Sequence, residues 1–277
     1  MSENFLELQN ITFSYQKKKQ YIFENFSVSI PSSNNIIGLL GSNGSGKTAL
    51  AKILIGLVKT ESGKVYLNEE DITKLRTTKR LSKISMTFQM TNNSFVKNTV
   101  KDELNYTYKL AQKIRSKLIQ NDQRSNILPE NWSSKTNQQP LTLSGGEKRK
   151  LIFQLLRILN PDLYILDEPT VGLDFYNIQE LKKEIEQLKQ SNKKVIIISH
   201  DLPFLLSLID TCIILDKNEN SNLSSLLYQG SLENYLLEQF SEADQFLNIP
   251  IEFIIYREKL LKNDLNKNFS YKNFLSS

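Results

Sequence analysis

Gly41-Ser42-Asn43-Gly44-Ser45-Gly46-Lys47-Thr48 is the strongest motif in the sequence. This stretch fits the phosphate-loop pattern, and it stands between an apolar run at Ile36–Leu40 and a helix-like segment at Thr48–Leu57. Glycines let backbone N–H groups turn inward around phosphate oxygens, and the helix end adds partial positive charge. Lys47 is expected to reach the outer phosphates, and Thr48 to bind Mg²⁺. Because a plain glycine-rich turn does not explain this Lys-Thr pair, the sequence predicts a phosphate site between a buried strand and a helix.

Helices and strands are expected to alternate along the chain after residue 140. The hydrophobic pattern predicts helices at Gly145–Leu159 and Ile178–Leu188, and strands at Leu163–Leu166 and Val195–Ser199. Such alternation implies a parallel sheet flanked by helices, which places the chain in the α/β class.

The first ninety residues are expected to supply further strands. Apolar and polar residues alternate over Ile11–Tyr15 and Phe26–Ile30, which predicts two antiparallel strands. Val65–Leu67 and Ile84–Phe88 also have the character of strands. An antiparallel β subdomain is therefore expected beside the parallel core.

The sequence predicts two helical additions. Apolar positions at helical spacing over Asn98–Leu118 indicate a helical insert, at about residues 90–160, with a polar connector. After Gly230, apolar helix faces starting at Leu232 and at Pro250 indicate a C-terminal appendage. The expected domains are thus 1–230 and the appendage 231–277. The basic tail Lys262–Lys272 is expected to be solvated surface.

The chain has 277 residues, of which 39% are hydrophobic and 23% are charged, so it can bury a sizeable core. The net charge of +5 could favour anionic ligands, nucleic acid or an anionic membrane face, but it decides nothing alone. Cys212 is the sole cysteine and is expected to be a buried apolar residue. A single cysteine cannot form an internal disulfide, so nothing requires an oxidising compartment.

Residues 1–10 do not resemble a signal peptide, and the apolar stretch Phe204–Leu215 is far short of the ~20 residues of a spanning helix. Any membrane role is therefore expected to be peripheral.

Two more segments carry residues suited to phosphate chemistry. Asp167 and Glu168 follow the strand expected at 163–166, at the edge where a doubly wound sheet binds ligands. Asp167 could hold a metal ion and Glu168 could polarise an attacking water, although an acidic pair alone is often only a strand end or helix cap. In Leu143–Glu147, the spacing of Ser144 and Glu147 is that of a capping box. The two glycines between them leave backbone N–H groups uncovered at a helix N-terminus, which makes a second anion site.

These segments together resemble the nucleotide-binding subunit of an ATP-binding cassette (ABC) transporter. The matching elements follow that family's order over about the first 230 residues: 41–48, Gln89, Leu143–Glu147, Asp167-Glu168, Gly172-Leu173-Asp174 and His200. The resemblance implies a P-loop NTPase cassette with a mixed core sheet, which binds ATP and Mg²⁺ and hydrolyses ATP.

The resemblance also implies a role for each matching residue. Tyr15 corresponds to an aromatic residue that stacks on adenine. Glu168 would be the base for the attacking water, and His200 would sense the γ-phosphate. Metal contacts would come from Thr48, Gln89 and Asp167, and Gln89 would also contact the attacking water. The implied nucleotide-binding residues are Tyr15, Gly41, Ser42, Asn43, Gly44, Ser45, Gly46, Lys47 and Thr48, with Ser144, Gly145, Gly146 and Asp174.

Partners follow from the same resemblance. In this family the Leu-Ser-Gly-Gly segment of one subunit closes over ATP held by another, so a head-to-tail dimer with a second copy or a paralogous chain is implied. The segments 13–15, 43–47 and 95–103 resemble energy-coupling factor (ECF) ATPases, which power uptake of vitamins or Co and Ni ions. The implied partners are a transmembrane coupling subunit and a substrate-binding membrane subunit, at the cytoplasmic face of the cell membrane. Phe175 stands in place of the usual Pro after Asp174.

Other ATPase and GTPase classes share parts of this pattern. Glu147 stands in place of the commoner Gln. Glutamate at this position is found in some ECF members and also in the soluble ATPase of iron–sulfur cluster assembly, which is the alternative function. Nucleic-acid-linked ABC ATPases usually carry two cassettes or long coiled-coil insertions, so no nucleic-acid partner is expected. Small GTPases share the phosphate loop but not the Leu143–Glu147 element.

Overall fold

The computed structural model describes residues 3–16, 20–87, 95–115, 132–218, 220–240, 247, 249–262 and 270–276. The chain divides into two compact units. Unit 1 comprises Met1–Leu50, Val58–Thr73 and Ile196–Ser277, and unit 2 comprises Ala51–Leu57 and Lys74–Val195. The chain passes between the units within helix α1 (Lys47–Leu54) and strand β8 (Lys194–Ile198). The predicted boundary at residue 230 stays a prediction.

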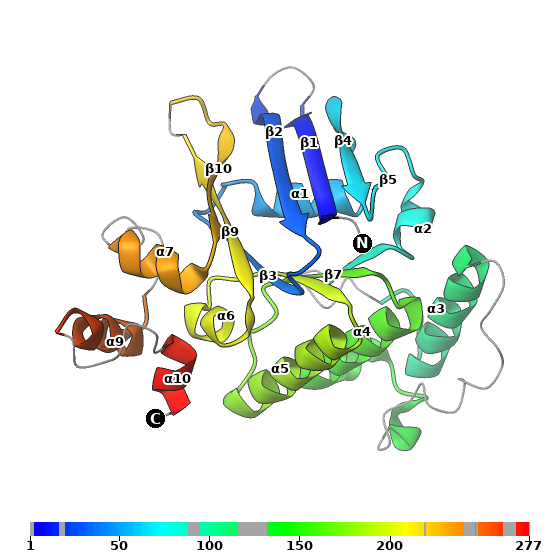
Figure 1. The fold of residues 1–277 in the computed structure, drawn as a ribbon. Helices are drawn as coiled ribbons and strands as arrows, with labels where there is room; N and C mark the ends of the chain where they lie inside the picture. Colours follow the sequence, from blue (N-terminus) through cyan, green and yellow to red (C-terminus); the bar gives the residue numbers. More distant parts are fainter. Residues whose placement is uncertain are drawn as a thin grey trace. The chain divides into compact units, whose positions relative to one another are not determined.

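Unit 1 contains the antiparallel sheet that the alternating residues predict. Its strands are β1 (Asn4–Ser14), β2 (Tyr21–Pro31), β4 (Ser62–Leu67) and β5 (Glu70–Asp71), in the order β2-β1-β4-β5. Leu8 of β1 is opposite Val28 of β2 on one side and Val65 of β4 on the other, and all three are buried. Cross-strand apolar pairs of this kind fix the register. Figure 1 shows β2, β1 and β4 side by side.

Unit 1 also contains β3 (Ile36–Gly41), the strand that leads into the glycine-rich loop. Every residue of β3 is buried, as expected for a strand covered on both faces. β3 runs parallel to β9 (Thr211–Lys217), and β10 (Ser224–Gly230) runs antiparallel to β9. This part of the core sheet therefore has the order β10-β9-β3.

The apolar stretch 204–215 folds as a helix and a strand. Helix α6 (Leu202–Leu208) ends before Asp210, whose Oδ2 accepts hydrogen bonds from the backbone N–H groups of Asn35 and Ile36, both at 3.0 Å. These bonds turn the chain into β9 beside β3. Cys212 on β9 is completely buried as predicted, and burial raises the pKa of its thiol to about 12.

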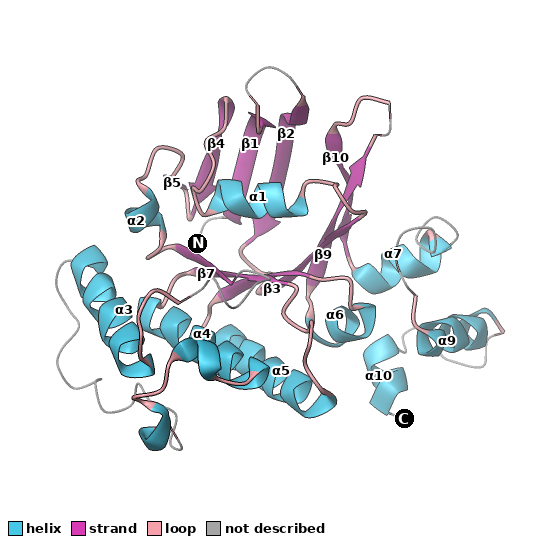
Figure 2. Ribbon diagram, turned by 180° about the vertical axis from the view of Figure 1, so that it is seen from behind, coloured by secondary structure: helices cyan, strands magenta, loops and turns pink. Residues whose placement is uncertain are grey.

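Unit 2 carries parallel strands and the helical insert. β6 (Ile84–Thr87) runs parallel to β7 (Leu163–Asp167), and α4 (Gly145–Leu159) and α5 (Phe175–Gln190) lie alongside each other (Figure 2). The short elements of this unit are helix α2 (Thr77–Arg80) and the 3₁₀ turns η3 (Ser133–Lys135) and η4 (Pro140–Thr142). The predicted insert helix is α3 (Val100–Arg115), and it shares with α4 a core of Val100, Leu104, Trp132, Leu143, Leu151 and Leu155.

The C-terminal helices α7 (Leu232–Glu238), α9 (Ile251–Leu261) and α10 (Tyr271–Ser276) belong to unit 1. The Glu233 carboxylate of α7 accepts hydrogen bonds from the Tyr256 hydroxyl, at 2.5 Å, and from the Tyr271 backbone N–H, at 3.0 Å. Tyr271 is 1% exposed and packs edge-on against Phe253. The expectation that the tail through Lys272 is solvated surface is therefore wrong at its end, because Tyr271 is part of an aromatic core. None of the described helices combines the length and the apolar composition that a membrane-spanning segment needs.

Candidate active site

The glycine-rich loop joins β3 to α1 in unit 1 and is built on tight backbone packing. Gly41, Gly44 and Gly46 all have positive φ angles, of 140°, 81° and 91°. A Cβ atom on Gly41 would stand 2.1 Å from the backbone oxygen of Leu215 in β9. A Cβ atom on Gly46 would stand 2.7 Å from Cζ of Phe23 in β2. The glycines therefore allow a loop conformation that a residue with a side chain would obstruct.

Lys47 begins α1 and folds back along the loop. Its side chain is buried, and its Nζ donates hydrogen bonds to the backbone oxygens of Gly41, at 2.7 Å, and Ser42, at 2.9 Å. The ammonium group is thus held beside the first N–H groups of a helix, which attract anions. Ser45, also in the loop, has a fully buried Oγ that finds no hydrogen-bond partner among the described residues. A loop of this shape and charge suits a polyphosphate.

We expect Gly41→Ala to lower the thermal unfolding temperature far more than Gly145→Ala. The new methyl group at residue 41 meets backbone atoms that cannot move away, whereas a Cβ atom on Gly145 has no neighbour within 4 Å in the described part of the chain. Overpacking and backbone strain of this kind each typically lower the free energy of unfolding by about 1–3 kcal/mol. Thermal denaturation without nucleotide measures the difference, and equal unfolding temperatures for the two variants would contradict the tight packing at Gly41.

Tyr15 and His200 are the other predicted site residues of unit 1. Tyr15 follows β1, is 57% exposed, and lies edge-on against Phe13 with 5.1 Å between the ring centres. Its exposed ring leaves a face for stacking. His200 is exposed in the turn between β8 and α6. Asp201 fixes this turn, because its carboxylate accepts a hydrogen bond from Phe204 N–H at the start of α6.

The acidic pair lies at the carboxyl end of β7 in unit 2. Asp167 is the last residue of the strand, and its backbone N–H donates to the Thr87 hydroxyl at the end of β6, at 3.3 Å. Glu168 adopts a left-handed conformation with φ of 46°, which is uncommon for glutamate. Glu69 shares this backbone region, with φ of 65°, so the conformation of Glu168 is compatible with a functional role without establishing one.

The Leu143–Glu147 segment forms the N-terminus of α4, as the capping-box pattern predicts. Ser144 Oγ accepts from the Glu147 N–H at 3.3 Å, and Glu147 Oε2 accepts from the Ser144 N–H at 3.0 Å. Gly145 and Gly146 occupy the first turn. These residues present helix N–H groups without side chains to cover them, which is the geometry of an anion site.

Asp174 belongs to the same unit and lies close to this turn. Its carboxylate caps α5 by accepting from the N–H and the side-chain amide of Asn177, at 2.8 and 2.9 Å. A Cβ atom on Gly146 would lie 3.1 Å from Oδ1 of Asn177. Asn177 therefore links Asp174 to the start of α4, a role that the sequence patterns did not reveal although its spacing from Asp174 is typical of a helix cap.

The predicted site residues that the structure describes are divided between the two units. Unit 1 holds Tyr15, the loop 41–48 and His200, and unit 2 holds Ser144, Gly145, Gly146, Asp167, Glu168 and Asp174. Gln89 lies outside the described residues. Three residues that the sequence patterns did not identify contact these segments: Thr87 accepts from Asp167, Asn177 donates to Asp174, and Lys135 forms an ion pair with Glu147.

Curated proteins are similar to this chain in sequence. An energy-coupling factor transporter ATP-binding protein, EcfA1 of Mycoplasma mobile, is 30% identical over 93% of this chain and 90% of its own length. A Bacillus cereus protein described as a putative ABC transporter ATP-binding protein is 32% identical over 79% of this chain. The matched part spans only 38% of that relative's length.

Solved structures agree on the fold. CbiO1 of Clostridium perfringens, described as part of the ABC transporter complex CbiONQ, superposes with a TM-score of 0.69 over 92% of this chain and 99% of its own, at 20% identity. The dimeric ATP-binding cassette MJ0796, bound to ADP and phosphate, gives a TM-score of 0.66 over 82% of this chain and 98% of its own, at 21% identity. The predicted α/β cassette fold is therefore confirmed. Because the sequence pattern of ABC transporters also matches residues 23–171, just over half of the chain, this protein belongs to the ABC transporter family.

Proposed function

We propose that this chain is the ATP-hydrolysing, nucleotide-binding subunit of an ABC transporter of the energy-coupling factor type, which imports a vitamin or a transition-metal ion. The observation that carries this proposal is the presence of two anion-accepting helix N-termini in one chain, the glycine loop of α1 and the capping-box turn of α4. A chain that carries both can hold ATP with the first and close over a neighbour's ATP with the second. The similarity to EcfA1 along nearly its full length supports the ECF branch.

The proposed roles follow from the chemistry of each group. Tyr15 stacks on the adenine, while the loop N–H groups and Lys47 bind the phosphates. Ser144, Gly145, Gly146 and Asp174 act across the dimer interface. Glu168 accepts the proton of the attacking water, and His200 and Gln89 contact the γ-phosphate and the water. Closure of the dimer on ATP and its reopening after hydrolysis move the membrane partner.

Thr48 and Asp167 would hold Mg²⁺, with Gln89 as a further ligand. Their hydroxyl, carboxylate and amide oxygens are the hard donors that this ion prefers, and Mg²⁺ typically uses few protein ligands beside phosphate oxygens and water. Thr48 follows Lys47 in the first turn of α1 and is exposed, which supports this assignment. The ion would neutralise charge that develops on the transferred phosphoryl group.

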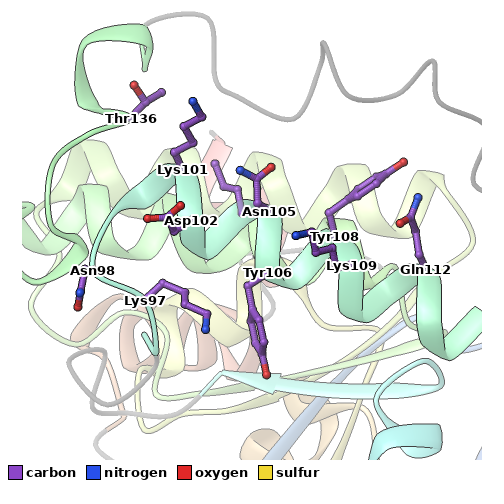
Figure 3. Close-up of a pocket in the computed structure, with 11 residues that line it drawn as sticks. Lys97, Asn98, Lys101, Asp102, Asn105, Tyr106, Tyr108, Lys109, Gln112 and Thr136 are labelled. Carbon is purple, nitrogen blue, oxygen red and sulfur yellow. The ribbon is translucent and has the colours of Figure 1, made fainter.

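A groove beside α3 suits the transmembrane coupling subunit as its partner (Figure 3). Its volume is about 850 Å³, and the described residues of its walls include Lys97, Lys101 and Lys109 against one carboxylate, Asp102. Lys97 Nζ lies 4.4 Å from the centre of the Tyr106 ring. A cationic groove with an exposed tyrosine favours a segment of the partner that carries carboxylates.

The groove is connected mechanically to the α4 turn. Val100 and Leu104 on α3 pack in one core with Leu151 and Leu155 on α4. At the start of α3, the buried Glu103 carboxylate accepts hydrogen bonds from the backbone N–H groups of Val96, at 2.9 Å, and Lys97, at 2.7 Å. Because α3 and α4 share a close-packed core, a movement of α4 on ATP-driven closure is carried to the groove.

We expect the double charge reversal Lys101→Glu and Lys109→Glu to reduce recovery of the protein with membranes by roughly tenfold, because two attractive contacts become repulsive. The measurement is co-sedimentation with membranes of the native host, with Lys189→Glu on α5 as the control. ATP hydrolysis by the purified subunit should be little changed. Undiminished sedimentation of the double variant would argue against this groove, and co-purification of the native protein with soluble scaffold subunits would favour iron–sulfur cluster assembly instead.

A further inference from the structure

Glu147 raises an electrostatic problem at the turn that begins α4. It is the third residue of the helix and carries a carboxylate beside the N–H groups of Gly145 and Gly146, the groups proposed to bind a neighbour's triphosphate. A negative charge stabilises the N-terminus of a helix but repels a second anion that binds there. The turn can receive triphosphate well only if the charge of Glu147 is compensated.

The structure places Lys135 at this carboxylate. Lys135 Nζ forms an ion pair with Glu147 Oε1, while Glu147 Oε2 accepts from the Ser144 N–H at 3.0 Å. The two side chains are only 29% and 30% exposed, so water and salt screen the pair less than a pair on the open surface. Each oxygen of Glu147 therefore has a defined partner, one that caps the helix and one that cancels its charge.

The backbone around Lys135 is fixed to the scaffold of unit 2. Lys135 N–H donates to the backbone oxygen of Trp132, which is 5% exposed and packs in the core that α3 and α4 share. The Lys101 N–H donates to Thr136 O at 2.9 Å, and the Val100 N–H donates to Gln138 O at 3.0 Å. These bonds attach η3 to the start of α3, so Lys135 approaches Glu147 from an ordered turn.

We propose that Lys135 is a positioning residue that neutralises Glu147 and thereby keeps the Ser144–Gly146 turn able to receive the triphosphate bound to a partner subunit. This inference rests on the proposed function. It gives Lys135, which the sequence patterns placed in a polar connector, a role in ATP-driven dimerisation through its charge. Lys135 need not touch the nucleotide.

A double-mutant cycle in the Glu168→Gln background tests this role. The measurement is the concentration of MgATP that gives half-maximal dimer, determined by light scattering after size-exclusion chromatography. Lys135→Met keeps an apolar stem and removes the charge, and we expect it to raise that concentration by roughly tenfold when Glu147 is intact. With Glu147→Gln also present, Lys135→Met should raise it less than about twofold, since no carboxylate remains to neutralise. Lys135→Arg should behave like lysine.

Each other outcome overturns the proposal. An equal loss from Lys135→Met with Glu147 intact and with Glu147→Gln present would show that Lys135 acts through packing or direct contact, and no loss in either background would show that the ion pair is inert. Thermal unfolding of each variant separates a folding defect, which Glu147→Gln would not rescue, from a charge effect. If the Glu168→Gln protein forms no dimer with MgATP at all, the proposed function fails. If that dimer forms but Lys135→Met gives one of the outcomes above, only this inference fails, so the two failures are distinguishable.

Discussion

Replacing Glu168 by glutamine is expected to lower the rate of ATP hydrolysis by about 10²- to 10⁴-fold, the range that a general base contributes. The amide has nearly the same size as the carboxylate but cannot accept a proton from water. Glutamine leaves the capping turn of α4 and the loop before α1 unchanged, so closure on ATP should persist while the step that reopens the dimer is lost. ATP-bound dimers are therefore expected to accumulate.

Steady-state phosphate release and dimer formation with MgATP together measure this effect. Glu186→Gln is a matched control, because Glu186 is an exposed carboxylate on α5 of the same unit. It should hydrolyse ATP at the native rate and form no stable dimer. A Glu168→Gln protein with near-native turnover would reject Glu168 as the base.

Replacing Lys47 by alanine is expected to weaken MgATP binding by about 10- to 100-fold, because hydrogen bonds to charged groups contribute about 1.5–3 kcal/mol. The ammonium lies where its Nζ bonds to Gly41 O and Ser42 O, within the loop itself. Its removal takes away a positive charge held at the proposed phosphate site and also releases two loop carbonyls. Both effects weaken the site.

Titration with a fluorescent ATP analogue measures the loss. Lys59→Ala is the control, because Lys59 is exposed and lies outside the loop. Thermal unfolding without nucleotide distinguishes loss of the charge from loss of the fold. Combined with Glu168→Gln, Lys47→Ala should prevent the dimer from accumulating at ATP concentrations that saturate the single Glu168→Gln variant. Unchanged affinity for ATP in a folded Lys47→Ala protein would show that Lys47 and its loop do not bind the nucleotide.

Local patterns in the sequence predicted most of the candidate site. The phosphate loop, the capping box of Ser144 and Glu147, and the strand that ends in Asp167 all depend on residues within a few positions of one another. Spacing along the chain decides these features, so a single sequence suffices to find them.

Features that depend on distant residues escaped the prediction. Strand β9 forms where Asp210 bonds to the N–H groups of Asn35 and Ile36, and no pattern near residue 210 indicates those partners. The charge of Lys135 is equally uninformative without the fold that places it beside Glu147. Tyr271, at the end of a basic tail, is buried only because Phe253 and the Glu233 carboxylate meet it there. Tertiary contacts determine each of these outcomes.

The contact between Phe23 and Gly46 makes nucleotide affinity a property of strand β2 as well as of the loop. Phe23 is completely buried, and its ring occupies the space that a side chain on residue 46 would need. The aromatic ring thus holds the glycine-rich loop in its conformation before ATP binds. ATP binding therefore has little conformational entropy of the loop left to remove. A random mutagenesis screen for weakened ATP affinity would therefore recover substitutions at Phe23, well upstream of the loop that binds the phosphates.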